Sequence, residues 1–472
     1  MTTAAAFLPE LVLLLGSLAL FVVCLGEGRI TLAKDLALGV ALVALLAAAF
    51  SLDQQALLFD GAYRVDLFSQ FLKLLFTAGL FLVLLMSGRL PDIRPDIKPE
   101  YFLFVLLSVC GLTMLVSSVE LITLVVALEL SAFPLYLMVP MRREREGQRT
   151  QMESAIKYIM FGVAANGIML FGMSYLFGLG GTTSLVGLAL ALRPMAHSPL
   201  ILVALAMTCC GLFYKVAVFP FHFWTPDVYQ GAAHETAGLI ASLPKVGAVA
   251  VLVRLVSLVD PQTETFAALL ALLALASMCY GNLLALGQRD FKRLLGFSGI
   301  AHAGYAMIGL VALDRAGYAA ALYYIAGYLL MVLACFAVIS QVSRDGVNVA
   351  IEDLAGLHRR SPLLALTLLV AVFALAGIPP FVGFMGKFAL LKAALAQGHL
   401  YLVVLAVLNA AVAVYYYLWV VREACFGEAV DQVPIVLNWS ARLLCLLLIA
   451  GIVGLGVAPG TILDLLSTSL RP

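Results

Sequence analysis

Charged side chains are scarce in this sequence of 472 residues. Asp, Glu, Lys and Arg together make up 12% of it, about half of the ~25% that is usual in soluble domains. Hydrophobic residues make up 63%, which is more than a soluble domain could bury. The formal net charge is +1, so nothing indicates a nucleic acid or a strongly acidic partner. The scarcity of charge therefore excludes an ordinary soluble protein.

Long polar stretches are also missing. The longest cover residues 140–153 and 342–361, and neither is long enough to fold around a core of its own. Apolar runs of about 18 or more residues recur instead from end to end, and each could cross a hydrocarbon layer of ~30 Å. The sequence therefore predicts an all-α polytopic membrane protein without a soluble domain.

Metal-binding cysteine patterns are absent as well. The eight cysteines are scattered, nearly all lie inside apolar runs, and no C-x-x-C motif occurs. Free cysteines in such surroundings behave as small apolar residues. We therefore expect no iron–sulfur or zinc site on this chain.

The apolar runs define about fourteen membrane spans. The first begins with Pro9 and Glu10 where a signal peptide would carry basic residues, so we expect it to be retained. Lys and Arg gather in the loops that follow the odd-numbered spans, for example at Arg142 and Arg143, which predicts that these loops face the cytoplasm and that both termini face the outer side. The spans lie near residues 5–25, 35–52, 66–87, 101–117, 119–139, 155–179, 199–231, 235–256, 264–286, 293–313, 317–341, 362–397, 399–424 and 439–458.

Four ionisable residues lie well inside these spans, namely Glu129, Lys215, Lys245 and Lys387. Each charge at the centre of a bilayer costs about 2.5–3.5 kcal/mol on insertion scales, so such residues are usually functional. Structural ion pairs are the alternative, but the lysines outnumber the glutamate and cannot all pair with it. A lysine, unlike an arginine, can lose its proton when desolvated and regain it beside a carboxylate. The set therefore favours proton transfer.

Three further residues are accessory candidates. His222 and His302 lie inside spans and titrate close to neutral pH when unperturbed, so they could join a relay, although a single histidine in a helix is often only a hydrogen-bonded core residue. Lys157 lies just inside its span and could either join the relay or extend its ammonium to the membrane surface.

Two spans contain helix breakers beside their lysines. Pro220 and Pro226 interrupt span 199–231, and Pro379 and Pro380 interrupt span 362–397. Proline removes a backbone hydrogen bond from a helix, and broken helices inside a membrane persist only where they are packed in protein or line a wet cavity.

Matching interruptions in two halves of a sequence indicate internal repeats. Glu129 and Lys215 are separated by almost the same number of residues as His302 and Lys387. The predicted repeats each hold five spans and so have opposite topology. They cover residues 101–256 and 264–424, between an N-terminal three-helix segment, 1–100, and a C-terminal helix segment, 425–472.

Five segments resemble subunit N of respiratory NADH:quinone oxidoreductase, or complex I, a family related to Mrp-type sodium/proton antiporters. They are Ala127–Tyr136, Phe213–Gly231, Gly281–Tyr305, Glu352–Pro362 and Gly377–Lys387. The resemblance implies fourteen helices with two inverted five-helix repeats, helices 7 and 12 being broken. It also implies a subunit of a translocase in the bacterial cell inner membrane, with other membrane subunits of complex I as partners.

The same resemblance implies roles for the ionisable residues. Glu129 and Lys215 would form the input pair, Lys245 the central relay lysine and Lys387 the output residue, with His222, His302 and Lys157 as accessory residues. No flavin, nucleotide or iron–sulfur motif occurs, so NAD, FMN, the clusters and quinone are expected on other subunits, and no cofactor on this chain.

The sequence departs from the family after Gly231, where a Pro-Thr-Pro stretch is usual and Ala232–Thr236 stands instead. His234 and Glu235 add titratable groups there. They could belong to a solvated turn or take part in proton entry.

Two other functions remain open on the sequence. A subunit of an Mrp-type cation/proton antiporter would use the same lysines. A membrane scaffold would use the buried charges only to pair helices.

Overall fold

The computed structural model describes residues 5–26, 29–144, 149–195, 198–258, 263–428 and 433–470. The described chain is mainly helical and packs as two units. Unit 1 comprises Met1–Leu212 and Ala250–Thr263, and unit 2 comprises Phe213–Val249 and Glu264–Pro472. The predicted all-α membrane architecture is confirmed.

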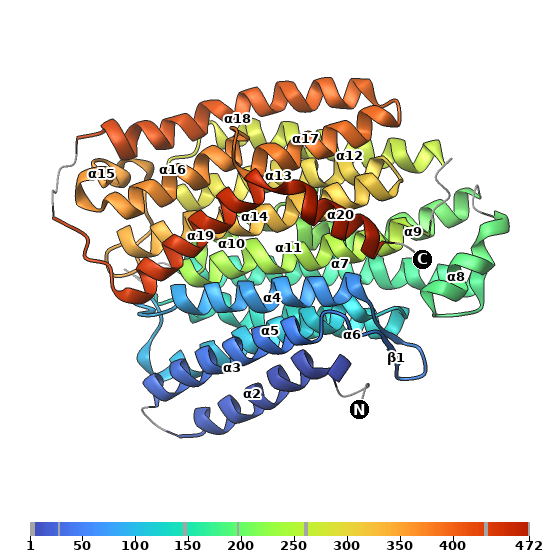
Figure 1. The fold of residues 1–472 in the computed structure, drawn as a ribbon, viewed down its shortest axis with the longest axis horizontal. Coiled ribbons are helices and arrows are strands. Elements are labelled where there is room, and N and C mark those ends of the chain that lie inside the picture. The colour runs from blue at the N-terminus through green and yellow to red at the C-terminus, as the bar shows by residue number, and fades with distance from the viewer. Residues whose placement is uncertain are drawn as a thin grey trace. The chain divides into compact units, whose positions relative to one another are not determined.

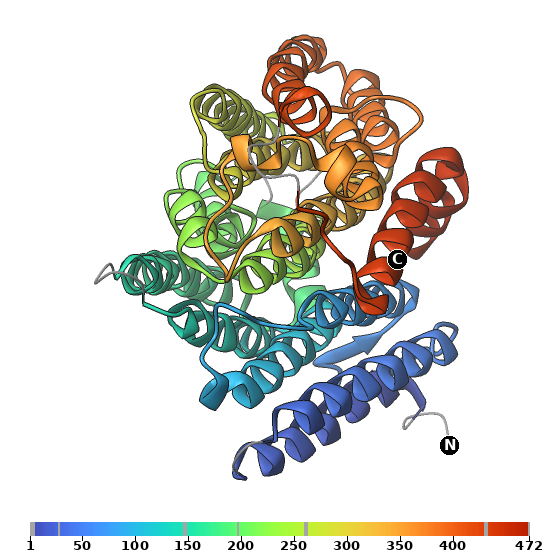
Figure 2. The same cartoon turned by 90° about the vertical axis from the view of Figure 1, so that its left-hand side faces the viewer.

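Unit 1 is built from the first helices of the chain. In it α2 and α3 lie side by side and pack against α4 and α5 (Figures 1 and 2). Its elements are α2 (Leu8–Cys24), α3 (Ile30–Phe50), β1 (Ala56–Leu58), β2 (Tyr63–Val65), α4 (Leu67–Met86), η1 (Pro95–Ile97), α5 (Lys98–Ser117), α6 (Leu121–Met138), η2 (Val139–Met141), α7 (Thr150–Gly180), α8 (Leu185–Leu192), η3 (Arg193–Met195), α9 (Pro199–Val216) as far as Leu212, and the end of α11 (His234–Val256) from Ala250.

Small residues bring the helices of unit 1 close together. The buried face of α3 is made of alanines, from Ala33 to Ala48. Gly111 of α5 faces the backbone of α6, where a Cβ would lie 2.4 Å from the amide nitrogen of Ser131. Small residues at such contacts are typical of membrane helices, because close packing replaces the hydrophobic effect between them.

Unit 2 is arranged around α13. This helix contacts α10, α12, α14 and α17, and all its residues except Arg293 are buried. A helix buried on every side indicates a central position. The elements of unit 2 are α10 (Trp224–Gly231), α11 as far as Val249, α12 (Glu264–Ala285), α13 (Phe291–Val311), α14 (Arg315–Val342), η4 (Ile351–Leu354), α15 (Leu357–Arg360), α16 (Pro362–Ala376), α17 (Val382–Ala396), α18 (Leu400–Phe426), α19 (Trp439–Val457) and α20 (Pro459–Ser469), together with the last residues of α9.

Both predicted breaks are present, but the first lies at Pro220 and not at Pro226, which is in the first turn of α10 (Trp224–Gly231), where a helix tolerates proline. The chain leaves α9 after Val216, passes a cis Phe219–Pro220 bond and enters α10 at Trp224. It leaves α16 at Gly377, whose φ is +88°, and passes a cis Pro379–Pro380 bond before α17. Lys215 precedes its break and Lys387 follows the other, so the two lysines occupy different places relative to the breaks.

A helix, or a pair of helices at the two breaks, lies at each of the fourteen predicted ranges. Twelve helices of the described residues are long and apolar enough to cross a membrane, and Leu8–Cys24, Leu185–Met195 and Pro362–Ala376 are shorter apolar helices. The helices α8 and α20 were not predicted, since they are too short to span a bilayer. The number of crossings, the inverted repeats and their boundaries stay predictions.

Candidate functional site

Lys245 lies inside unit 2, on the part of α11 that belongs to this unit. It follows Pro244 in α11, and its Nζ is buried and donates to the carbonyl of Gly299 on α13 at 3.2 Å. The rings of Tyr229 and Tyr328 lie 6.0 and 5.4 Å from Nζ. Gly299 makes this approach possible, because a Cβ there would come within 3.1 Å of Nζ. Among the described residues no carboxylate forms an ion pair with Lys245. The protonated amine is instead stabilised by the carbonyl of Gly299 and by the faces of the two tyrosine rings.

Lys387 uses the break before α17. Its Nζ donates to the carbonyls of Leu375 and Ala376 at 3.0 and 3.1 Å. These belong to the last turn of α16, whose carbonyls have no partner within a helix and carry partial negative charge. Gly377 makes room, because a Cβ there would lie 3.2 Å from Nζ. The interruption that the sequence predicted thus supplies the acceptors for this lysine.

His302 lies between the two lysines. It is on α13 and buried, and both of its ring nitrogens have partners. Nδ1 lies 2.6 Å from Oη of Tyr324, and Nε2 lies 3.0 Å from Oη of Tyr417. Its ring centroid is 5.0 Å from that of Tyr328 and 6.3 Å from that of Tyr305. Tyr328 also faces Lys245, and the ring of Tyr305 lies 4.8 Å from Nζ of Lys387. His302 is therefore in contact with one tyrosine beside each lysine.

Sequence reasoning missed the uncharged members of this array. The 17 tyrosines of the chain differ little from one another in sequence, and only helical spacing, as at Tyr324 and Tyr328, could have indicated a shared face. The buried network continues where Tyr416 Oη donates to Asn282 at 3.0 Å and Asn282 donates to the carbonyl of Asn409 at 3.1 Å. We call Tyr229, His302, Tyr305, Tyr324, Tyr328 and Tyr417 the tyrosine–histidine array.

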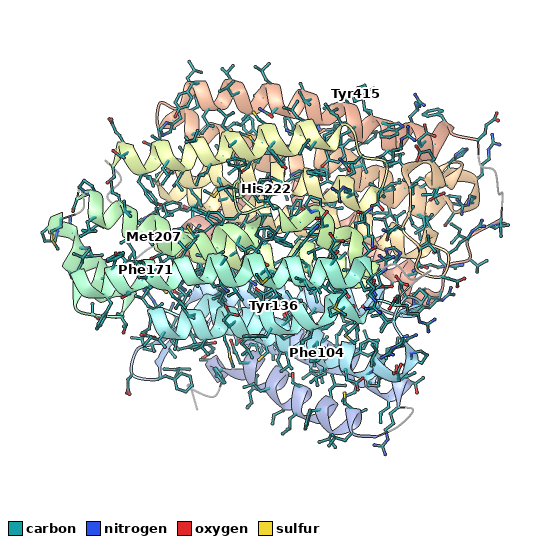
Figure 3. The ribbon with its side chains drawn as sticks, turned by 180° about the vertical axis from the view of Figure 1, so that it is seen from behind. Phe104, Tyr136, Phe171, Met207, His222 and Tyr415 are labelled. Carbon is teal, nitrogen blue, oxygen red and sulfur yellow. The ribbon has the colours of Figure 1, made fainter. Side chains whose placement is uncertain are left out.

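The other predicted residues of unit 2 lie near the first break. Lys215 is buried in the last turn of α9, with Nζ 5.6 Å from the ring centroid of Tyr214. His222, labelled in Figure 3, is buried against Phe219 and Tyr280, with ring centroids 5.3 and 4.2 Å away. Neither of its nitrogens has a hydrogen-bond partner among the described residues. None of these neighbours belongs to the tyrosine–histidine array, so His222 lies outside it.

Glu129 and Lys157 belong to unit 1. Glu129, partly exposed on α6, accepts a hydrogen bond from Asn166 of α7. Lys157 pairs with Glu153 at 2.6 Å, and its side chain is 37% exposed. An exposed pair one turn apart favours the surface position for Lys157 over the relay. The predicted input pair of Glu129 and Lys215 would join the two units and stays a prediction.

A buried charge cluster in unit 1 was not predicted. Lys73 of α4 and Glu10 of α2 are both fully buried, with Nζ and Oε1 2.8 Å apart. Tyr63 of β2 donates to the same Oε1 at 2.7 Å. Burial, together with the charge of Glu10, raises the pKa of Tyr63 well above its usual value, which keeps its hydroxyl a donor. In the sequence, Glu10 and Lys73 lie near the ends of their predicted spans, where charged residues are common. Their pairing is therefore not predictable from the sequence.

His234 and Glu235, at the start of α11, are both buried. The interpretation as a solvated turn therefore does not hold for their side chains. His234 Nε2 lies 2.9 Å from Oγ of Ser343, a contact that no sequence spacing indicates.

Comparisons with known proteins show the family to which the chain belongs. The family model described as NADH:quinone oxidoreductase/Mrp antiporter, TM, matches residues 118–413. NADH-quinone oxidoreductase subunit N 2 of Opitutus terrae is 63% identical, and the alignment covers 100% of this chain and 98% of that protein.

Solved structures are similar along nearly the whole chain. A chain of respiratory complex I from Thermus thermophilus with bound aureothin has a TM-score of 0.83 and 32% identity, covering 97% of this chain and 98% of that one. A chain of the Mrp complex from Dietzia sp. DQ12-45-1b has a TM-score of 0.88 at 20% identity, covering 99% and 97%, and shows a common fold. The chain belongs to the NADH:quinone oxidoreductase/Mrp antiporter family of membrane proteins, and within it to the subunit N group.

Proposed function

We propose that this chain is a proton-translocating membrane subunit of an NADH:quinone oxidoreductase. The observation that carries the proposal is the buried array of unit 2, in which Lys245 and Lys387 are connected through tyrosines and His302. Buried ionisable groups without a carboxylate partner are expensive for a membrane protein and mark proton pathways.

The array has the chemistry that a relay needs. Lys245 and Lys387 can each carry a proton on Nζ, held by carbonyls and aromatic rings rather than by a fixed counter-charge. Imidazole can accept a proton on one nitrogen and release another from the opposite one. The hydroxyls of Tyr324 and Tyr417 sit on the two nitrogens of His302 and can each donate and accept.

The driving redox chemistry belongs to other subunits in this proposal. Within the described residues, no group of three or more His, Cys, Asp or Glu is placed to hold a metal ion. We assign NAD, FMN, iron–sulfur clusters and quinone to partner subunits, and place this chain in the bacterial inner membrane with both termini outside. An antiporter subunit is less well supported, because the 63% identical relative is a subunit N.

Replacing Lys245 by alanine tests the function. We expect NADH-driven proton pumping and quinone reduction to fall together, by about tenfold or more, while the complex still assembles. Pumping, quinone reduction and assembly would be measured in membranes of the native host. Failure to assemble would favour a scaffold, and unchanged NADH-driven activity would favour an antiporter or another function.

Replacing Tyr417 by phenylalanine tests the link to His302. Loss of one hydrogen bond is worth about 0.5–1.5 kcal/mol, so we expect coupled activity to fall about two- to tenfold. Tyr415, on the same helix and labelled in Figure 3, is 70% exposed and serves as the matched control. Equal effects of Tyr417→Phe and Tyr415→Phe would argue against a role for the hydroxyl.

A further inference from the structure

Unit 2 contains a cavity of about 400 Å³ beyond the end of α14, with several charged side chains in its lining. It lies in the stretch 342–361, which the charge pattern predicts to face the cytoplasm. Charged walls of this kind hold water. The polar and charged lining residues are Ser343, Arg344, Asn348, Glu352, Asp353, Arg360 and Glu428.

Ser343 connects this cavity to a buried histidine. Its side chain lines the cavity and is partly exposed, whereas His234 behind it is buried. Oγ of Ser343 lies 2.6 Å from the carbonyl oxygen of Val347 and 2.9 Å from Nε2 of His234. The hydroxyl has one proton and two acceptors within reach. When it donates to Val347 it accepts from Nε2, and when it rotates it can donate to Nε2.

The start of α11 is held in place from α13. Lys292 is buried and donates to the carbonyl of Ala232 at 2.7 Å. This contact lies two residues before His234, so the position of the imidazole relative to the cavity is fixed by backbone on two sides, at Ala232 and at Val347.

His234 also shares a helix face with Lys245. The two residues are about three turns apart in α11, which places them in line on one face and ~16 Å apart. Gly238 and Ala241 occupy the same face between them. Neither has a side chain beyond Cβ, so α11 itself places no bulky side chain between the histidine and the central lysine on this face.

We propose that Ser343 and His234 form the entry through which protons pass from the cavity toward Lys245. This rests on the proposed relay function. A hydronium ion in the cavity gives a proton to Oγ of Ser343 as the hydroxyl gives its own proton to Nε2 of His234, and a neutral water is left in the cavity. The imidazolium then releases its Nδ1 proton toward the Lys245 side, which leaves the neutral ring with its proton on Nε2. Before the next transfer the ring exchanges this tautomer for the one with the proton on Nδ1, with no net gain or loss of a proton.

A structural role for the same residues makes a different prediction. If His234 only holds the loop at Val347 in place through Ser343, then His234→Gln should keep the activity. The amide nitrogen of glutamine can donate a hydrogen bond where Nε2 does. A relay cannot use glutamine, because an amide does not carry a proton at neutral pH. In the same way Ser343→Thr keeps the hydroxyl and Ser343→Ala removes it.

The experiment measures NADH-driven proton pumping, quinone reduction and assembly in native membranes. We expect His234→Gln to lower coupled activity about tenfold or more, Ser343→Ala to lower it severalfold, and Ser343→Thr to retain it. Ser340, one turn earlier on α14 and bonded to the carbonyl of Ala337, lies outside the cavity lining, so Ser340→Ala should retain full activity. Added imidazole should restore part of the activity of His234→Gly.

A wild-type rate in either His234→Gln or Ser343→Ala would overturn the entry. If Lys245→Ala is inactive at the same time, the relay function stands and only this entry fails. If Lys245→Ala is active too, both proposals fail. Should His234→Gln not assemble, the contrast between Ser343→Ala and Ser343→Thr decides the question.

Discussion

Replacing Lys387 by alanine should nearly abolish NADH-driven proton pumping. The ammonium of Lys387 is held by two carbonyls at the end of α16, and alanine leaves nothing at that position to accept a proton from the tyrosine–histidine array. Loss of a positioned proton carrier lowers rates by about 10²–10⁴-fold. Pumping and quinone reduction in native membranes should fall together.

Two variants make this test specific. Lys387→Arg keeps the positive charge and its hydrogen bonds, but arginine does not release its proton in proteins. A relay therefore predicts loss of activity in Lys387→Arg, and a purely structural lysine predicts retention. Lys392 lies exposed on the same helix, so Lys392→Ala should be as active as the wild type. Full activity in Lys387→Arg would remove Lys387 from the relay.

Replacing Lys73 by methionine should destabilise unit 1 strongly. Glu10 would lose its cationic partner while remaining fully buried, with only Tyr63 donating to it. Breaking a buried ion pair by removing one partner costs about 3–5 kcal/mol. The midpoint of thermal unfolding of the purified complex in detergent should fall clearly, and less of the complex should assemble.

A double variant separates lost pairing from lost packing. Glu10→Gln combined with Lys73→Met removes both charges and should recover most of the lost stability, because uncharged replacements of buried pairs are often neutral. Arg94→Met breaks the exposed pair with Asp96, whose side chains are 62% and 65% exposed, and should cost about 1 kcal/mol or less. If Lys73→Met is as mild as Arg94→Met, the buried pair contributes little.

Patterns that lie along the chain could be predicted from the sequence. The positions of the helices follow from long apolar runs, and the breaks at Pro220 and Pro379 follow from the missing backbone donors of proline. Lys245 and Lys387 stood out because a charge inside an apolar run has a large solvation cost. Such features depend on neighbours in sequence and need no knowledge of how helices pack.

Contacts between distant segments could not be predicted in this way. Tyr324 and Tyr417 are ordinary apolar-span residues until α14 and α18 bring their hydroxyls to the two nitrogens of His302. Glu10 and Lys73 form an ion pair only because the packing of unit 1 brings these parts of α2 and α4 together. The residues around His234 in sequence are compatible with a solvated turn, because its burial and its contact with Ser343 involve a segment more than 100 residues away.

The sequence by itself determined that this is a helical membrane protein with broken helices and intramembrane lysines, because hydrophobicity, proline chemistry and the cost of buried charge act locally. Only the tertiary structure decided which uncharged side chains connect those lysines, and that Ser343 at the cavity lies beside the buried His234. These contacts join helices that are far apart in the chain, and the packing of the helices sets the hydrogen-bond distances between their side chains.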